Sequence, residues 1–154
     1  MPSVGSTRRE LYIYMESNIV KGSCLCGEVS YEITPPFKSF RYCHCPRCRK
    51  HTGSAHASNL FVASDHYRLV KGEDVVSRFN LPDARSFARC FCTKCGSPIP
   101  HHSRRGDYVV IPAGSLDDDP HILPECSIFW DFRARWFKDF DDIPKFAEYP
   151  PDKE

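Results

Sequence analysis

The sequence predicts a mainly β fold built from short strands. Thirteen prolines and eight glycines are spread along the 154 residues, a distribution that disfavours long helices and favours strands joined by turns. Two tryptophans, seven tyrosines and eleven phenylalanines supply the bulk for one modest core, so we expect a single domain. Eight of the nine cysteines fall into three tight groups, which predicts bound metal within that domain.

Apolar and polar residues alternate in the first expected strand, and turn residues separate the expected strands. The first strand covers residues 28–34 and ends at Pro35 and Pro36. Residues 57–63 and 66–70 resemble a hairpin, and no segment has a convincing amphipathic helical pattern. The other expected strands cover residues 37–43, 75–79, 86–91, 108–112 and 127–130.

The expected domain covers residues 19–150, between a disordered N-terminal extension (1–18) and a short tail (151–154). The net charge of +1 provides no bulk attraction to nucleic acid or membrane, so neither is an expected partner. No segment approaches the roughly 18 apolar residues that span a bilayer, and no secretory signal is evident. These features predict a cytoplasmic protein.

The spacing of the cysteines is typical of zinc ligands. Alternate residues of a strand point to the same side, so the thiols of a C-x-C unit can bind one ion, and a C-x-x-C unit does the same around a tight turn. An odd cysteine count and a reducing cytosol argue against disulfides. The groups are Cys24 with Cys26, Cys43 with Cys45 and Cys48, and Cys90 with Cys92 and Cys95.

Seven or eight cysteines are too many for one tetrahedral zinc site and sufficient for two. Spacing alone does not say which groups share an ion, but the economical division is one closed four-thiolate site and one three-thiolate site with a vacant position. Thiolates outweigh the charge of Zn²⁺ in both, so the surroundings should supply positive charge. The flanking basic residues are Arg41, Arg47, Arg49, Lys50, Arg89 and Lys94.

A protein ligand that closes the second site is the alternative, and the sequence offers Cys90, His51, His56, His101 and His102 as candidates. More often a thiol such as Cys90 is simply buried. His44 lies between two ligands and should point away from their metal, which favours a surface position. Cys126 is isolated and is expected to be a small core residue. Pro46 is expected to form a turn, and Gly96 to adopt left-handed backbone.

Several motifs in order resemble the glutathione-dependent formaldehyde-activating enzyme family, over about residues 20 to 150. The matching segments are 22–27, 43–50 with Gly53 and Ser54, 91–98, 113–117, 128–129 and 142–146. The resemblance implies an Mss4-like fold of several short antiparallel sheets organised around zinc-binding cysteine clusters. It also implies a structural zinc held by Cys24, Cys26, Cys92 and Cys95, and a second, open zinc held by Cys43, Cys45 and Cys48.

In that family the open zinc is thought to capture the thiol of glutathione and promote its addition to formaldehyde, formally a carbon-sulfur lyase reaction in reverse. The resemblance therefore implies two Zn²⁺ ions per chain, with Cys43, Cys45 and Cys48 as the catalytic metal ligands. Glutathione or a similar small thiol is the implied co-substrate, and formaldehyde or another aldehyde its partner. Arg47, Arg49 and Lys50 are candidates to contact the carboxylates of a peptide-like thiol.

The chain departs from the family pattern near its end. Ser127 replaces the histidine that relatives commonly have, and residues 130–136 contain two aromatic residues and two arginines. If this loop borders the open site, it favours a bulkier or differently charged ligand. The alternative functions are a non-catalytic zinc module that binds protein or nucleic acid, and a carrier of thiol or zinc.

Overall fold

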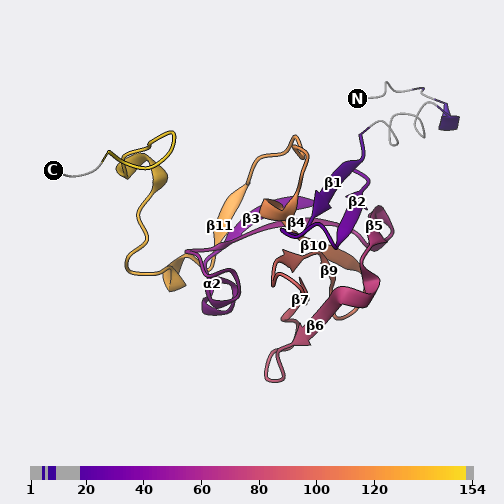
Figure 1. Ribbon diagram of the computed structural model, residues 1–154, viewed down its shortest axis with the longest axis horizontal. Coiled ribbons are helices and arrows are strands. Elements are labelled where there is room, and N and C mark those ends of the chain that lie inside the picture. Colours follow the sequence, from indigo (N-terminus) through magenta and orange to yellow (C-terminus); the bar gives the residue numbers. More distant parts are fainter. Residues whose placement is uncertain (1–4, 6, 10–17, 152–154) are drawn as a thin grey trace.

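The computed structural model describes residues 5, 7–9 and 18–151, and in these residues the strands form three small sheets (Figure 1). The prediction of a mainly β fold is confirmed. The expected extension, 1–18, falls largely on residues outside the described part, as does most of the expected tail, 151–154. None of the helices in the described residues is long and apolar enough to cross a bilayer.

The five-stranded sheet is the centre of the fold, with strand order β11-β3-β4-β10-β9. Neighbouring strands are antiparallel, except that β11 runs parallel to β3. The expected bounds of β4 and β10 match the observed ones. The strands are β3 (Ser39–Cys43), β4 (Ala57–Ala63), β9 (His101–His102), β10 (Tyr108–Pro112) and β11 (Cys126–Ile128).

Two three-stranded sheets, with orders β1-β2-β5 and β6-β7-β8, complete the described strands. All of their pairs are antiparallel. The strands are β1 (Val20–Ser23), β2 (Ser30–Ile33), β5 (Tyr67–Lys71), β6 (Val76–Asn80), β7 (Ala88–Cys92) and β8 (Pro98–Ile99). Three short 3₁₀ turns lie between strands of the described residues, η1 (Ser64–His66), η2 (Glu73–Val75) and η3 (Ala113–Ser115). Two more follow the last strand, η4 (Trp130–Phe132) and η5 (Phe140–Asp142).

The main core lies where the central sheet meets the sheet of β1 and β2. Val109, Val110 and Ile111 are consecutive and all buried, so both faces of β10 are covered. Leu60 and Val62 of β4 point into the same core, as their alternation predicts. Apolar burial of this kind holds the sheets together with little help from helices.

The predicted hairpin of residues 57–63 and 66–70 is wrong. The two segments are strands, but β4 pairs with β3 and β10, whereas β5 pairs with β2 in another sheet. The turn η1 explains the crossing, because the carbonyl of His66 accepts a hydrogen bond of 2.8 Å from the amide of Thr34 at the end of β2. The chain leaving η1 is therefore directed along β2.

A short helix, α2 (Pro46–Thr52), replaces the turn expected at Pro46. Proline fits the first position of a helix, where its missing N–H has no intrahelical acceptor. Cys45 caps the helix by accepting a hydrogen bond from the amide of Cys48, and Gly53, with φ of 64°, ends it. The helix has 7 residues, too few for the sequence to display an amphipathic period.

Gly22 in β1 allows close packing against Tyr31 of β2. The Tyr31 ring occupies the space that a Cβ at residue 22 would need. The buried hydroxyl of Tyr31 lies 2.5 Å from the hydroxyl of Ser115. It also donates a hydrogen bond of 3.0 Å to the backbone carbonyl of Ser115. These contacts hold η3 against β2, the neighbour of the strand β1 that leads to Cys24.

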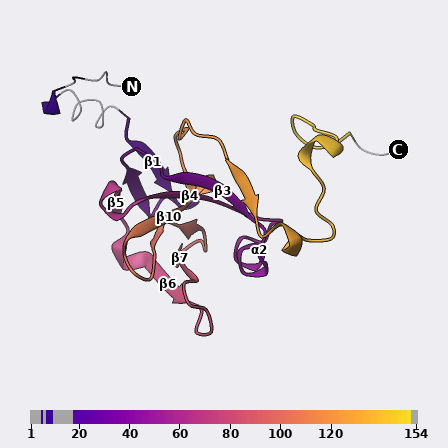
Figure 2. The same ribbon diagram turned by 180° about the vertical axis from the view of Figure 1, so that it is seen from behind.

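The chain leaves the sheets after β11. The strand ends at Ile128 and not at Trp130, because Phe129 turns the backbone with φ of 54°. Phe129 and Trp130 are 55% and 40% exposed, and Cys126 is exposed, so the core position expected for Cys126 is wrong. Residues 138–151 are all exposed, and both views show the segment after η4 running away from the sheets (Figures 1 and 2).

Candidate metal centres

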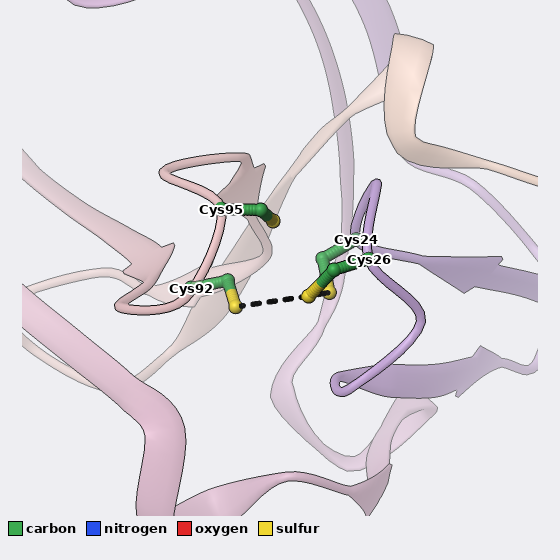
Figure 3. Close-up of side chains that lie close together, drawn as sticks. All are labelled: Cys24, Cys26, Cys92 and Cys95. Carbon is green, nitrogen blue, oxygen red and sulfur yellow. Dashed lines mark hydrogen bonds between the residues drawn. The ribbon is translucent and has the colours of Figure 1, made fainter.

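The four-cysteine cluster consists of Cys24, Cys26, Cys92 and Cys95. Their sulfur atoms all lie within 4.8 Å of one another. Figure 3 shows the two pairs facing each other from separate loops, with Cys26 and Cys92 joined across a distance of 3.8 Å. Zinc holds sulfur at about 2.3 Å, so adjacent thiolate ligands of one zinc ion lie roughly 4 Å apart. The distances between the four sulfurs fit this requirement.

Two loops bring these sulfurs together from different sheets. Cys24 follows β1, whereas Cys92 ends β7, so an ion held here would join the sheet of β1 to the sheet of β7. Gly27 and Gly96 follow the two pairs with φ of 75° and 74°, and their amides donate back to the carbonyls of Cys24 and Cys92. The left-handed backbone predicted for Gly96 is confirmed.

Ser97 connects the two loops of this cluster. Its hydroxyl oxygen accepts hydrogen bonds from the amide of Leu25, at 3.1 Å, and from the thiol of Cys95, at 3.2 Å. Hydrogen bonding to the Ser97 side chain and backbone lowers the pKa of Cys95 to about 6. Ionised thiols are the form that binds zinc, so this environment favours metal binding.

The three-cysteine cluster consists of Cys43, Cys45 and Cys48. Cys43 ends β3, Cys45 is the N-cap of α2, and Cys48 lies in the first turn of that helix. Their sulfurs also lie within 4.8 Å of one another, and within the described residues no fourth histidine, cysteine or carboxylate joins the group. The candidates to close it, Cys90, His51, His56, His101 and His102, all lie outside this group.

Cys43 and Cys48 of the three-cysteine cluster differ in how readily their thiols lose a proton. A hydrogen bond from the Cys48 thiol lowers the pKa of Cys43 to about 6. The same contact with Cys43, together with burial, raises the pKa of Cys48. The cluster thus favours a first thiolate at Cys43 near neutral pH, and a bound cation would favour ionisation of the others.

Arg89 is the basic residue that reaches the three-cysteine cluster. Its Nη2 donates to the sulfur of Cys48 at 3.1 Å, and its Nη1 donates to Nε2 of His101 at 3.1 Å. The guanidinium carbon lies 4.5 Å from the centre of the Phe87 ring. The sequence identified Arg89 only as one of six flanking cations, because its partner Cys48 lies 41 residues away.

The three basic candidates for substrate contact lie on α2. Arg47 and Lys50 are exposed, whereas Arg49 is half-buried, and its Nε has no hydrogen-bond partner in the described residues. Because α2 also carries Cys48, these side chains belong to the same element as the three-cysteine cluster. Their role as contacts for a carboxylate remains a prediction.

His44 is completely buried, so the predicted surface position is wrong. It points away from the cysteines on either side into an aromatic group, with ring centres 5.1 Å from Trp130, 5.1 Å from Phe137 and 5.3 Å from His56. Burial lowers its pKa. The loop that departs from the family pattern therefore packs, through Trp130, against the side chain of His44 between two cysteines of the cluster.

A hollow of about 690 Å³ lies between the four-cysteine cluster and the end of α2. Sequence reasoning missed this hollow, although Ser54 and Ser97 lie within the segments that carry the family resemblance. Asp117 at its edge accepts a hydrogen bond of 2.9 Å from Ser23. Its polar lining residues are Ser23, Thr52, Ser54, His56, Ser58, Ser97, Ser115 and Asp117.

The fold and the two sulfur clusters define a class: small, mainly β proteins whose cysteines can hold metal. The model of the family described as glutathione-dependent formaldehyde-activating enzyme matches residues 19–132, and the chain belongs to this family. A crystal structure of a Rhodobacter sphaeroides protein has the same fold, with a TM-score of 0.56 and 24% identity over 70% of this chain and 97% of that chain. The search of curated proteins found no match.

Proposed function

We propose that the protein is a zinc-dependent enzyme of the carbon-sulfur lyase type. It would bind a small thiol such as glutathione at the three-cysteine cluster and promote its addition to formaldehyde or another aldehyde. The observation that carries the proposal is the grouping of Cys43, Cys45 and Cys48 without a fourth protein donor among the described residues. A tetrahedral ion with three protein ligands keeps one position for an exogenous ligand.

The reaction is an addition that needs no oxidant or reductant. The sulfur of the thiol forms a bond to the carbonyl carbon, the π bond of the carbonyl breaks, and the proton of the thiol passes to the carbonyl oxygen. A zinc ion at the cluster would supply a Lewis acid that favours the thiolate at neutral pH. The four-cysteine cluster would hold the second zinc of the chain as a structural ion.

The surroundings support a peptide-like thiol. Arg47, Arg49 and Lys50 lie on the helix that carries Cys48 and could bind carboxylates. The hydroxyl-rich hollow, at the opposite end of that helix from Cys45, offers hydrogen-bonding groups for amides. The family model, which covers 19–132, agrees with this substrate class. Of the nine cysteines, seven would bind metal as free thiols, and the cytoplasm keeps thiols reduced. We therefore propose a cytoplasmic location.

The test is a rate comparison, because thiols add to formaldehyde without help. Exchange between glutathione and its hydroxymethyl adduct would be measured by NMR in buffer, with wild type, and with the Cys48→Ser variant. The matched control is Cys126→Ser, which changes an exposed cysteine outside both clusters. We expect wild type and Cys126→Ser to accelerate exchange and Cys48→Ser to match buffer. Equal rates with wild type and buffer, despite bound zinc, would leave a thiol or zinc carrier as the function.

A further inference from the structure

Arg89 is a buried cation without a carboxylate partner. The residue is 8% exposed, and the salt bridges found within residues 18–151 do not include it. A buried charge needs a compensating charge or a full set of hydrogen bonds to be tolerated. Its side-chain hydrogen bonds go to the carbonyl of Ala88, to His101 and to Cys48. Among these partners only Cys48 can carry negative charge.

The neighbouring histidines do not supply that charge. Burial, followed by the proximity of Arg89, lowers the pKa of His101 to about 3 and of His51 to about 4. Both are therefore neutral near pH 7. His101 can accept from the guanidinium only as a neutral ring, which agrees with the distance of 3.1 Å between Nη1 and Nε2. The histidine orients the arginine, and Phe87 covers one face of it.

The strand β7 explains how Arg89 reaches this position. Side chains alternate along a strand, so Arg89 and Cys92 point to opposite faces of β7. Cys92 belongs to the four-cysteine cluster, whereas Arg89 contacts the three-cysteine cluster. Four of the other five flanking cations are less suitable, since Arg41, Arg47, Lys50 and Lys94 are exposed, and water screens their charge. Arg49 is half-buried, but it makes no side-chain hydrogen bond to a cluster sulfur within the described residues.

We propose that Arg89 is a positioning residue that fixes the sulfur of Cys48 and balances the negative charge of the metal-loaded three-cysteine cluster. This inference rests on the proposed function, because it concerns the same zinc. Three thiolates outweigh the charge of Zn²⁺ by one, and one guanidinium offsets the difference. The balance favours a neutral or exchangeable fourth ligand over a permanent fourth thiolate. The four-cysteine cluster makes no such contact with a buried arginine within the described residues.

The test is zinc affinity, measured by competition with a chelator of known affinity. Arg89→Met removes the positive charge and the hydrogen-bond donors. Arg89→Lys keeps the charge but lacks the planar arrangement of guanidinium N–H donors. The matched control is Arg85→Met, which removes an exposed arginine four residues earlier. We expect Arg89→Met to weaken zinc at the three-cysteine cluster by about 10- to 100-fold. Arg89→Lys should recover part of the loss, and Arg85→Met should match wild type.

Zinc at the four-cysteine cluster is the internal reference and should be unchanged in every variant. Affinity at the three-cysteine cluster within about twofold of wild type in Arg89→Met would overturn the inference. Failure of wild type to bind a second zinc would instead overturn the proposed function. The two failures are therefore distinguishable without an activity assay.

A double-mutant cycle covers the case in which Arg89→Met does not fold. Arg89→Lys would be combined with Cys48→Ser, and thermal midpoints of the four metal-loaded proteins would be compared. If Arg89 acts through Cys48, the lysine substitution should lower the midpoint less when Cys48 is already absent. Additive shifts would show that the two residues act independently and would overturn the inference.

Discussion

The two cysteine clusters differ in how their negative charge is arranged. The four-cysteine cluster gathers sulfur from two sheets, and its Cys26 is exposed to solvent. The three-cysteine cluster gathers sulfur from one short segment, and it has a buried arginine in place of a fourth cysteine. The ligands of the first cluster come from separate sheets, whereas the second cluster includes no fourth protein donor among the described residues. Under the proposed function, the number of sulfurs and the surrounding charge together would distinguish a structural zinc site from a reactive one.

The largest effect is expected for Cys92→Ser. Cys92 is completely buried and connects the sheet of β7 to the loop after β1. Structural zinc contributes apparent free energies of about 10–16 kcal/mol to folding, so loss of one ligand should prevent stable folding. Circular dichroism and zinc analysis should show loss of cooperative unfolding and of both ions. A folded Cys92→Ser protein with one zinc would show that the clusters are less different than we propose.

Cys48→Ser should have a smaller effect on the fold. Zinc content should fall from about two ions to about one, while cooperative unfolding persists. The physical reason is that α2 and β3 are adjacent in the sequence, so the three-cysteine cluster does not join distant sheets. Mass spectrometry under native conditions would count the ions, with Cys126→Ser as the control. Loss of both ions would contradict the independence of the two clusters.

Acid should destabilise the surroundings of Arg89. The pKa of His101, about 3 in the folded protein, lies below its ordinary value of 6.5, so the unfolded chain binds the proton more strongly. Stability is therefore retained above pH 6.5 and lost as the pH falls from 6.5 toward 3, by up to about 1.4 kcal/mol per pH unit for this residue. His101→Gln, which keeps an acceptor, should give a flatter dependence in urea unfolding between pH 7 and 5. An unchanged slope would contradict this assignment.

The smallest effect is expected for Ser97→Ala, which removes a contact between the two loops of the four-cysteine cluster. The amide of Leu25 and the thiol of Cys95 lose their acceptor. Each of the two lost hydrogen bonds should lower the free energy of unfolding by about 1 kcal/mol, which urea unfolding of the metal-loaded protein would measure. Ser58→Ala, at another edge of the hollow, is the control, and an equal effect there would contradict the role of Ser97.

The sequence could predict features that depend on local pattern. Residues 57–63 and 108–112 alternate or run apolar between turn residues, and β4 and β10 have these bounds. Pairing between strands is not local, so the hairpin of 57–63 and 66–70 was predicted wrongly. α2 was missed because its N-terminal proline favours a turn equally well and its 7 residues hide any period.

The same limit applies to the candidate site. Cysteine spacing predicted the clusters, since ligands of one ion come from short, sharply turned segments. It could not select Arg89 from six flanking cations, because the contact with Cys48 depends on how β7 packs. His44 was misplaced for a related reason. Its direction away from the cysteines was a sound expectation, but the aromatic residues that cover it come from residues 130–137, far along the chain.

The parallel strand β11 places the carboxyl-terminal part of the chain beside β3, the strand that ends at Cys43. The carbonyl of Ile128 accepts a hydrogen bond of 3.0 Å from the amide of His44, which sits between two of the sulfur-bearing residues. A truncation that removes Ile128 would therefore remove a hydrogen bond that holds the backbone between Cys43 and Cys45.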